Sequence, residues 1–293
     1  MIRSVTVTNY RGDSIKLELA KPEKSGFVVK SITGLGPVKS TINTTEMSTT
    51  DGALYNSART PSRNIVFNLG FLWKNTIEEV RLESYKYFPN KKKIKMLFET
   101  DARLAEIEGY VESNEPDIFS SSEGATISVI CPDPYFYLAG VENVTSFDGI
   151  NPLFEFPFCN DSLTEPLLEM SEIVSITENV VKYEGDVEIG ITLNFHALGP
   201  VKNISIFNLD TRDVMRLNTE MQAGDDIIVN TVKGNKSVDL IRDGQRTSIL
   251  RCLSKDSDWF TITKGTNRFA YESEGGKEYL QLTIRNRIIY EGV

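Results

Sequence analysis

The chain has 293 residues, 40% of them hydrophobic and 25% charged, and its formal net charge at pH 7 is −9. This length predicts two domains, each large enough to bury its own core. No apolar run approaches the roughly 18 residues of a membrane helix, and the acidic charge argues against a dedicated nucleic-acid-binding protein. The first residues lack the apolar block of a signal peptide, so we expect no export.

The first half of the chain is predicted to be mostly β-strand. Apolar side chains at every second position are typical of a half-buried strand. This pattern recurs in segments 4–8, 15–19, 26–32, 63–72, 94–99, 105–112 and 125–131. One helix is predicted over residues 76–88, because Thr76 and Glu79 have the spacing of a capping box and Pro89 ends the helical pattern.

Two closely spaced prolines mark the predicted domain boundary. Pro132 and Pro134 end a strand and stiffen the chain, so we predict domains over residues 1–138 and 139–293. The second domain is predicted to be all-β, because short strands and turn signals alternate at the spacing of a sandwich. Its predicted strands cover 189–195, 203–208, 214–217, 226–230, 237–242, 259–263, 267–271 and 280–284. Asp243-Gly244 predicts a type I′ hairpin turn.

Two glycine-containing segments superficially resemble phosphate-binding loops. Gly34 and Gly36 lack the third glycine of the dinucleotide fingerprint, and residues 234–237 lack the order of a P-loop. Both segments are predicted to be turns. Glu112, Glu115 and Asp117 could supply the carboxylate pair of a glycoside hydrolase, but the cluster is local and interrupted by proline, which favours a solvated loop.

Other chemically active residue types occur without a completed motif. Asp256 and Asp258 resemble part of a calcium loop but lack its glycine and distal glutamate, so a polar turn is favoured. His196 is the only histidine, and no nucleophile motif accompanies it. The three cysteines, Cys131, Cys159 and Cys252, are far apart in the sequence, and no two of them form a CxxC motif. We therefore predict no catalytic residue, no metal site and no cofactor.

Two segments are candidates for contacts between subunits. The basic run 91–95 is predicted to be a solvated hairpin or an intermolecular salt-bridge patch. The aromatic strip 154–158 is predicted to pack on its own sandwich or against another subunit, and own-sandwich packing is the favoured alternative. The candidate interface residues are Lys91, Lys92, Lys93, Phe154, Phe156 and Phe158.

Two long segments together resemble a known family. The first, residues 76–136, has a capped helix, a YFP stop, a lysine run, an FETD strand, a GYVES strand and a closing CPDPYF. The second, residues 183–269, begins at Tyr183-Glu-Gly-Asp186, continues through the Asp243-Gly244 hairpin and reaches KGTNRF at 264–269. These features are similar to those of the distal tail protein (Dit) family of long-tailed bacteriophages, the siphovirus-type tail components. Residues 143–186 match the family poorly.

The resemblance implies a fold and a structural role. The implied fold is mainly β, with an N-terminal β-sandwich or split barrel carrying one α-helix and a C-terminal galectin-like β-sandwich. Members form rings, usually hexamers, at the distal end of the virion tail, and DNA passes through the ring. The implied partners are the tail tube protein, a tail-associated hub protein, and receptor-binding or baseplate proteins, with assembly in the bacterial cytoplasm.

Two other functions remain as alternatives. One is a carbohydrate-binding adhesion module that uses exposed aromatic side chains such as Trp259. The His, Asn, Arg, Trp and Glu constellation of sugar-binding galectins is absent from the sequence, so no sugar-binding residue is transferred. The other alternative is an enzyme that acts on cell-wall glycan through Glu112 or Asp117. We expect a structural virion protein without catalytic activity.

Overall fold

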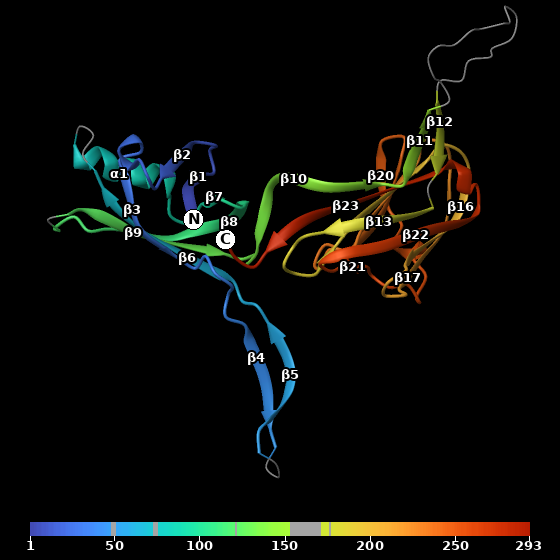
Figure 1. The fold of residues 1–293 in the computed structure, drawn as a ribbon, viewed down its shortest axis with the longest axis horizontal. Coiled ribbons are helices and arrows are strands. Elements are labelled where there is room, and N and C mark those ends of the chain that lie inside the picture. The colour runs from blue at the N-terminus through green and yellow to red at the C-terminus, as the bar shows by residue number, and fades with distance from the viewer. Residues whose placement is uncertain (48–50, 73–75, 121, 153–170, 176) are drawn as a thin grey trace, which may run out of the picture. The chain divides into compact units, whose positions relative to one another are not determined.

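The computed structural model describes residues 1–47, 51–72, 76–120, 122–152, 171–175 and 177–293. The chain divides into two units (Figure 1). Unit 1 contains Met1–Val141 together with Ile289–Val293, and unit 2 contains Glu142–Ile288. Strand β10 (Phe136–Ser146) runs through the point where the sequence analysis placed the boundary, and strand β23 (Leu280–Tyr290) leads back into unit 1. Residues 139–141 and the last five residues therefore lie in unit 1, although the sequence analysis placed them in the second domain.

Unit 1 is built of antiparallel strands and one α-helix, in agreement with the predicted mainly β fold. Most of these strands belong to one sheet with two halves that share β8, one in the order β2-β1-β7-β8 and the other in the order β8-β9-β6-β3. The strands are β1 (Ile2–Thr8), β2 (Ser14–Glu18), β3 (Phe27–Thr33), β4 (Thr41–Glu46), β5 (Ala53–Arg59), β6 (Arg63–Phe71), β7 (Lys93–Thr100), β8 (Leu104–Pro116) and β9 (Gly124–Cys131).

The core of unit 1 lies between the two halves of this sheet. Buried residues alternate along β1, β6, β7 and β8, including Val5 and Val7 of β1 and Phe67 of β6, while β2 and β3 each contribute one buried residue, Leu17 and Phe27. The long strand β8 passes from β7 to β9 at Tyr110. A β-carbon added at the preceding residue, Gly109, would lie 2.7 Å from a side-chain carbon of β9. A larger residue at position 109 would therefore force its β9 neighbours to move.

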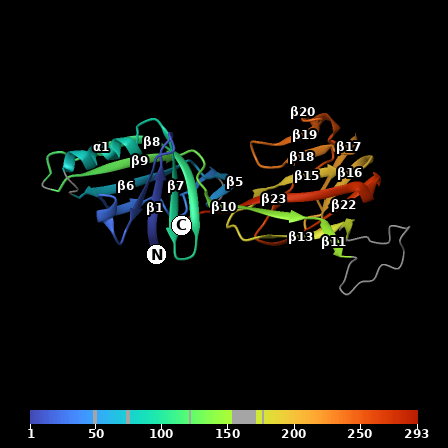
Figure 2. The ribbon, with the colours of Figure 1, turned by 90° about the horizontal axis from the view of Figure 1, so that it is seen from above.

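Helix α1 (Ile77–Tyr87) lies beside β6 and β8 (Figure 2). As predicted, Thr76 caps it: its Oγ1 accepts a hydrogen bond from the Glu79 main-chain nitrogen at 3.2 Å. Val80 of the helix is buried. Phe88, which directly follows the helix, packs on Phe67 with ring centroids 5.7 Å apart. A narrow apolar stripe is thus enough to fix this helix on the sheet.

Unit 2 is a β-sandwich. One sheet has the order β23-β15-β18-β19-β20 and the other the order β13-β22-β16-β17. Tyr271 of the second sheet donates a hydrogen bond to the Leu280 carbonyl of the first, at 2.9 Å. Its further strands are β11 (Asp148–Pro152), β12 (Ser171–Ser175), β13 (Glu178–Tyr183), β14 (Ile189–Gly190), β15 (Thr192–Ala197), β16 (Val201–Asn208), β17 (Val214–Met221), β18 (Asp226–Asn230), β19 (Ser237–Arg242), β20 (Gln245–Ser248), β21 (Thr261–Ile262) and β22 (Gly265–Gly275).

The turn chemistry of unit 2 follows the sequence closely. Asp243 and Gly244 have φ angles of 51° and 75°, as a type I′ turn requires, and they join β19 to β20. Residues 234–237 lie in the turn between β18 and β19 and at the start of β19.

The sequence analysis missed β11, β12 and β13, and the strand predicted over 189–195 is divided at Ile191.

Candidate assembly surfaces

The hairpin of β4 and β5 projects from the rest of unit 1 as a two-stranded ribbon (Figure 1). Every residue of both strands is exposed. Three of them are large apolar residues: Ile42 is 62% exposed, Leu54 54% and Tyr55 66%. An isolated two-stranded hairpin is at best marginally stable in water. The ribbon therefore has the properties of a surface that becomes covered by another molecule.

The sequence analysis did not predict this ribbon. Asp51-Gly52 lies between the two strands, and Gly52 has a φ of 96°. An Asp-Gly pair between two β-prone segments is a hairpin signal, so this signal could have revealed the element. Its strands lacked the apolar alternation used to find the others, because neither face of the ribbon is buried within the chain.

A second group of exposed apolar side chains, here called the helix-and-turn patch, lies on α1 and on the turn between β8 and β9. Its members are Leu82, Tyr85, Ile118 and Phe119. The Phe119 side chain is fully exposed. The helix and the turn are neighbours, because Arg81 of α1 lies 3.4 Å from Glu123, which precedes β9. Exposed aromatic side chains of this kind are typical of protein–protein contact surfaces.

The predicted basic run lies at the start of β7 and is partly neutralised within unit 1. Lys93 contacts Glu108 and Lys95 contacts Glu106, each at 2.7 Å across the β7–β8 pair. The hydrogen bond to Glu108 raises the pKa of Lys93. The Lys92 ammonium lies 5.5 Å from the Tyr10 ring centroid, and Lys91 is exposed with a φ of 63°. The positive charge of this run is thus spread over intramolecular contacts, which makes it a poor phosphate-binding cluster.

The aromatic strip of the sequence analysis lies outside the described residues. Phe154, Phe156 and Phe158 all fall within 153–170. Their role as subunit contacts stays a prediction, as does that of Lys91, Lys92 and Lys93.

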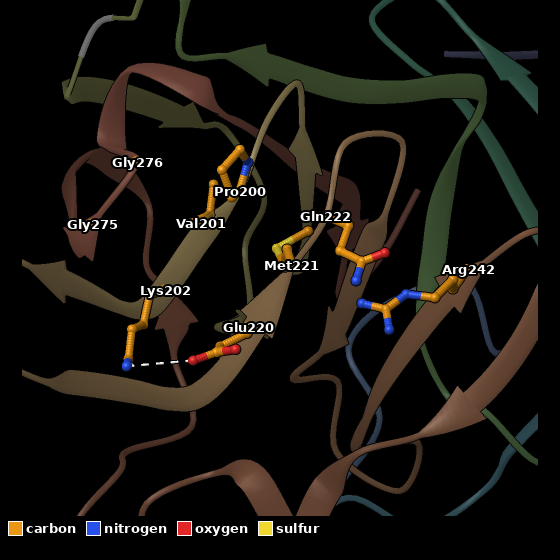
Figure 3. Close-up of a pocket in the computed structure, with 9 residues that line it drawn as sticks. All are labelled: Pro200, Val201, Lys202, Glu220, Met221, Gln222, Arg242, Gly275 and Gly276. Carbon is orange, nitrogen blue, oxygen red and sulfur yellow. Dashed lines mark ion pairs between the residues drawn. The ribbon is translucent and has the colours of Figure 1, made fainter.

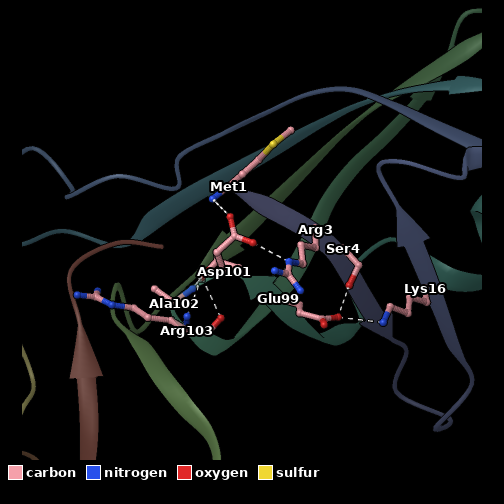
Figure 4. Close-up of polar contacts among 9 residues, drawn as sticks. Met1, Arg3, Ser4, Lys16, Glu99, Asp101, Ala102 and Arg103 are labelled. Atoms are coloured by element: carbon pink, nitrogen blue, oxygen red, sulfur yellow. Dashed lines mark hydrogen bonds and ion pairs between the residues drawn. The ribbon is translucent and has the colours of Figure 1, made fainter.

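A polar network surrounds a hollow of about 540 Å³ at β1 and β7 (Figure 4). Asp101 accepts hydrogen bonds from the Met1 nitrogen at 2.8 Å and from Arg3 Nε at 2.6 Å. Glu99 accepts hydrogen bonds from Ser4 at 2.8 Å and Lys16 at 2.9 Å. The hydrogen bond from the Met1 nitrogen lowers the pKa of Asp101, and the one from Lys16 lowers that of Glu99. Carboxylates held ionised in this way are not suited to act as general acids.

A hollow of similar size, about 550 Å³, lies on unit 2 between the ends of β16, β17 and β22 (Figure 3). Lys202 and Glu220 form an ion pair across it at 3.3 Å. Arg242 is bonded to both carboxylate oxygens of Asp225 at 2.9 and 2.5 Å. The residues that line this hollow include one carboxylate, Glu220, and no aromatic ring. The hollow therefore offers neither a carboxylate pair nor a stacking platform for a sugar.

The three acidic residues considered for glycan hydrolysis do not form one site. Glu115 and Asp117 line a shallow hollow of about 230 Å³ beside Lys30. Glu112 does not line it, and its Oε2 lies 2.8 Å from Ser128 Oγ. The structure thus places them as surface residues of β8 and the following turn.

The remaining polar candidates have structural partners. Asp258 accepts a hydrogen bond from the Val214 nitrogen at 3.3 Å, as expected for a turn residue. His196 Nδ1 lies 2.9 Å from Asp226 Oδ1 on the neighbouring strand.

Burial raises the pKa of the Cys131 thiol to about 12, which leaves it unreactive. Lys236 lies 5.0 Å from the Trp259 ring centroid. Within the described part of the chain, no group of three His, Cys, Asp or Glu residues could hold a metal ion.

Part of unit 2 matches a known protein family. Residues 184–287 match the family described as siphovirus-type tail component, C-terminal domain. A search of curated protein sequences finds no match. No helix in the described residues is long and apolar enough to cross a membrane. The family match lies within unit 2, which is therefore similar to the C-terminal domain of siphovirus-type tail components.

The whole fold is similar to that of a distal tail protein. The crystal structure of the Dit protein (gp 19.1) of phage SPP1, described as a hub adsorption apparatus of phages that infect Gram-positive bacteria, superimposes with a TM-score of 0.66. The alignment covers 97% of this chain and 99% of that one, at 12% identity. Chains of the phage P2 baseplate in its activated conformation with Ca and with Sr give TM-scores of 0.45 and 0.44, at 14% and 13% identity, with 98% of each chain covered. The resemblance to the distal tail protein family is confirmed.

Proposed function

We propose that this protein is a distal tail adaptor that forms a closed ring, joins the phage tail tube to the tail-tip or receptor-binding apparatus, and lets DNA pass. The observation that carries this proposal is the ribbon of β4 and β5. It belongs to unit 1, exposes every residue, and includes three large apolar side chains. A ribbon of this kind is stabilised when another subunit covers it.

A ring has a further requirement, because each copy must offer two different surfaces. Head-to-tail contacts that close under rotation join one patch of a subunit to another patch of its neighbour. Unit 1 supplies two exposed apolar surfaces, the ribbon and the helix-and-turn patch. We propose that the ribbon of one copy packs on the helix-and-turn patch of the next, and that six copies close the ring.

The charge of the ribbon is compatible with DNA transit. Residues 41–59 contain Glu46 and Asp51 but no lysine, and Arg59 is their only basic residue. A passage that carries DNA must not bind phosphate strongly, and binding to DNA grows with the number of cations that contact it. A ribbon rich in Thr, Ser and Asn would meet that condition.

The proposed partners follow from the role of an adaptor. They are further copies of this chain, the tail tube protein, a tail-associated hub protein, and receptor-binding or baseplate proteins. The proposed location is the distal end of the virion tail, with assembly in the host bacterial cytoplasm. Phe154, Phe156 and Phe158 remain candidates for one of these contacts, and Lys91, Lys92 and Lys93 for another.

The oligomeric state of the purified full chain tests the proposal. Mass photometry over a concentration series should show a discrete species of six copies, and negative-stain electron microscopy should show closed rings. A strictly monomeric protein at every concentration, which also fails to enter tails when supplied to an assembly reaction, would refute the ring.

A further inference from the structure

Arg63, the first residue of β6, is a buried arginine whose partners are main-chain carbonyls. Its Nε donates to the Pro134 carbonyl at 2.6 Å, and its Nη1 donates to the carbonyls of Gly34 and Gly36 at 2.5 and 2.6 Å. Its Nη2 donates to the Glu291 carbonyl at 2.5 Å. Only 2% of the residue is exposed. Four of the five N–H donors of the guanidinium are therefore used inside unit 1.

The four carbonyls come from three separate segments. Residues 34–36 form the loop between β3 and β4, Pro134 precedes β10, and Glu291 directly follows β23. Pro134 thus belongs to the first segment of unit 1, which ends at Val141, and Glu291 belongs to the second, Ile289–Val293. The guanidinium carbon also lies 4.5 Å from the ring centroid of Phe136, at the start of β10. One side chain therefore contacts both of the chain segments that make up unit 1.

The returning segment makes a further contact with the same loop. The Val293 nitrogen donates to the Leu35 carbonyl at 3.1 Å, so residues 289–293 are held by main-chain and side-chain bonds together. We propose that Arg63 is a latch, which keeps residues 289–293 in unit 1 by joining them to the loop after β3 and to the segment that leads into β10. The inference does not depend on ring formation.

The chemistry of the latch requires arginine. The planar guanidinium presents five donors in a fixed fork and keeps its charge even when burial lowers its pKa, as it does here. A lysine at this position would keep the charge, but its three donors radiate from a single atom and cannot reach four carbonyls in this arrangement. Arg63→Lys therefore separates the geometry of the latch from its charge.

Hydrogen exchange of the full chain, followed by mass spectrometry, tests the latch. Hydrogen bonds from charged donors are among the strongest in proteins, so we expect exchange to rise at least about tenfold in Arg63→Lys and Arg63→Met. The rise should occur together in the loop 34–36, in residues 135–137 and in 289–293. Arg103→Met is the matched control. Arg103 also contacts the returning segment, through the Gly292 carbonyl at 3.4 Å and the Tyr290 ring at 4.2 Å, so its loss should affect 289–293 alone.

Two results would overturn the latch. One is unchanged exchange in all three segments of a folded Arg63→Lys protein. The other is an equal rise across the whole of unit 1, which would mean that Arg63 serves general stability. If Arg63→Met does not fold, a chain shortened after Tyr290 replaces it. With Arg63 intact, its loop 34–36 and residues 135–137 should exchange faster, and no change there would also refute the proposal.

Discussion

Replacing Tyr55 by aspartate is the sharpest test of the ribbon as an assembly surface. The Tyr55 residue is 66% exposed. A tyrosine side chain buries about 150–250 Å² when fully covered, so its exposed part amounts to about 100–165 Å². At about 25 cal/mol per Å², complete coverage by a partner contributes about 2.5–4 kcal/mol to each contact. Tyr55→Asp removes this contribution, which weakens each contact by a factor of about 10² to 10³.

Mass photometry across a concentration series measures this effect, and circular dichroism verifies that the fold is intact. Tyr55→Phe keeps the apolar area and should assemble like the unmodified chain. Tyr279→Asp changes a partly exposed tyrosine of unit 2, 42% exposed, and should also leave the proposed contact between ribbon and helix-and-turn patch unchanged. If Tyr55→Asp and Leu54→Asp both give the oligomer distribution of the unmodified protein, the ribbon is not the contact and the reasoning fails.

Three further substitutions test the structure of the two units. Arg242 holds the pKa of Asp225 below its usual range, so the folded state binds fewer protons than the unfolded one. The stability that this pair adds to unit 2 is therefore complete above about pH 4 and is lost as the pH falls through the folded pKa. Urea unfolding should show this acid loss in the unmodified chain and a smaller one in Asp225→Asn, where the lowered pKa values of Asp210 and Asp239 still contribute. Gly109→Ala places a β-carbon 2.7 Å from Val129 Cγ1 and should lower the unfolding free energy of unit 1 by about 1–3 kcal/mol; an unchanged urea midpoint would contradict that packing. Thr76→Ala removes the helix cap and should cost about 1 kcal/mol, whereas Thr76→Ser should not.

The sequence predicted most strands because burial of one face imposes the pattern that was sought. Val5 and Val7 in β1, and Ile65, Phe67 and Leu69 in β6, alternate in the sequence because they alternate into the core. The helix and its cap were predictable for a similar reason, since the capping bond joins residues three positions apart. Local chemistry of this kind leaves a local signature.

The ribbon left only the Asp51-Gly52 turn signal, and the contacts of Arg63 left no local signature. The ribbon has no face buried within its own chain, so its apolar residues follow no period. The partners of Arg63 are main-chain carbonyls, which any residue supplies, and one of them lies 228 positions away. The return of residues 289–293 to unit 1 is likewise set by tertiary contacts. A boundary placed at the prolines therefore assigned this segment to the second domain.

The composition of the ribbon bears on when it is covered. An exposed edge with a continuous apolar face pairs indiscriminately with other chains. Here Ile42, Leu54 and Tyr55 stand among Thr, Ser and Asn residues, and Glu46 adds a charge at the end of β4. Burial of these apolar side chains is enough to stabilise contact with one complementary surface. The polar residues between them disfavour nonspecific pairing. The monomer should therefore stay soluble with its ribbon free, and assembly should depend steeply on concentration.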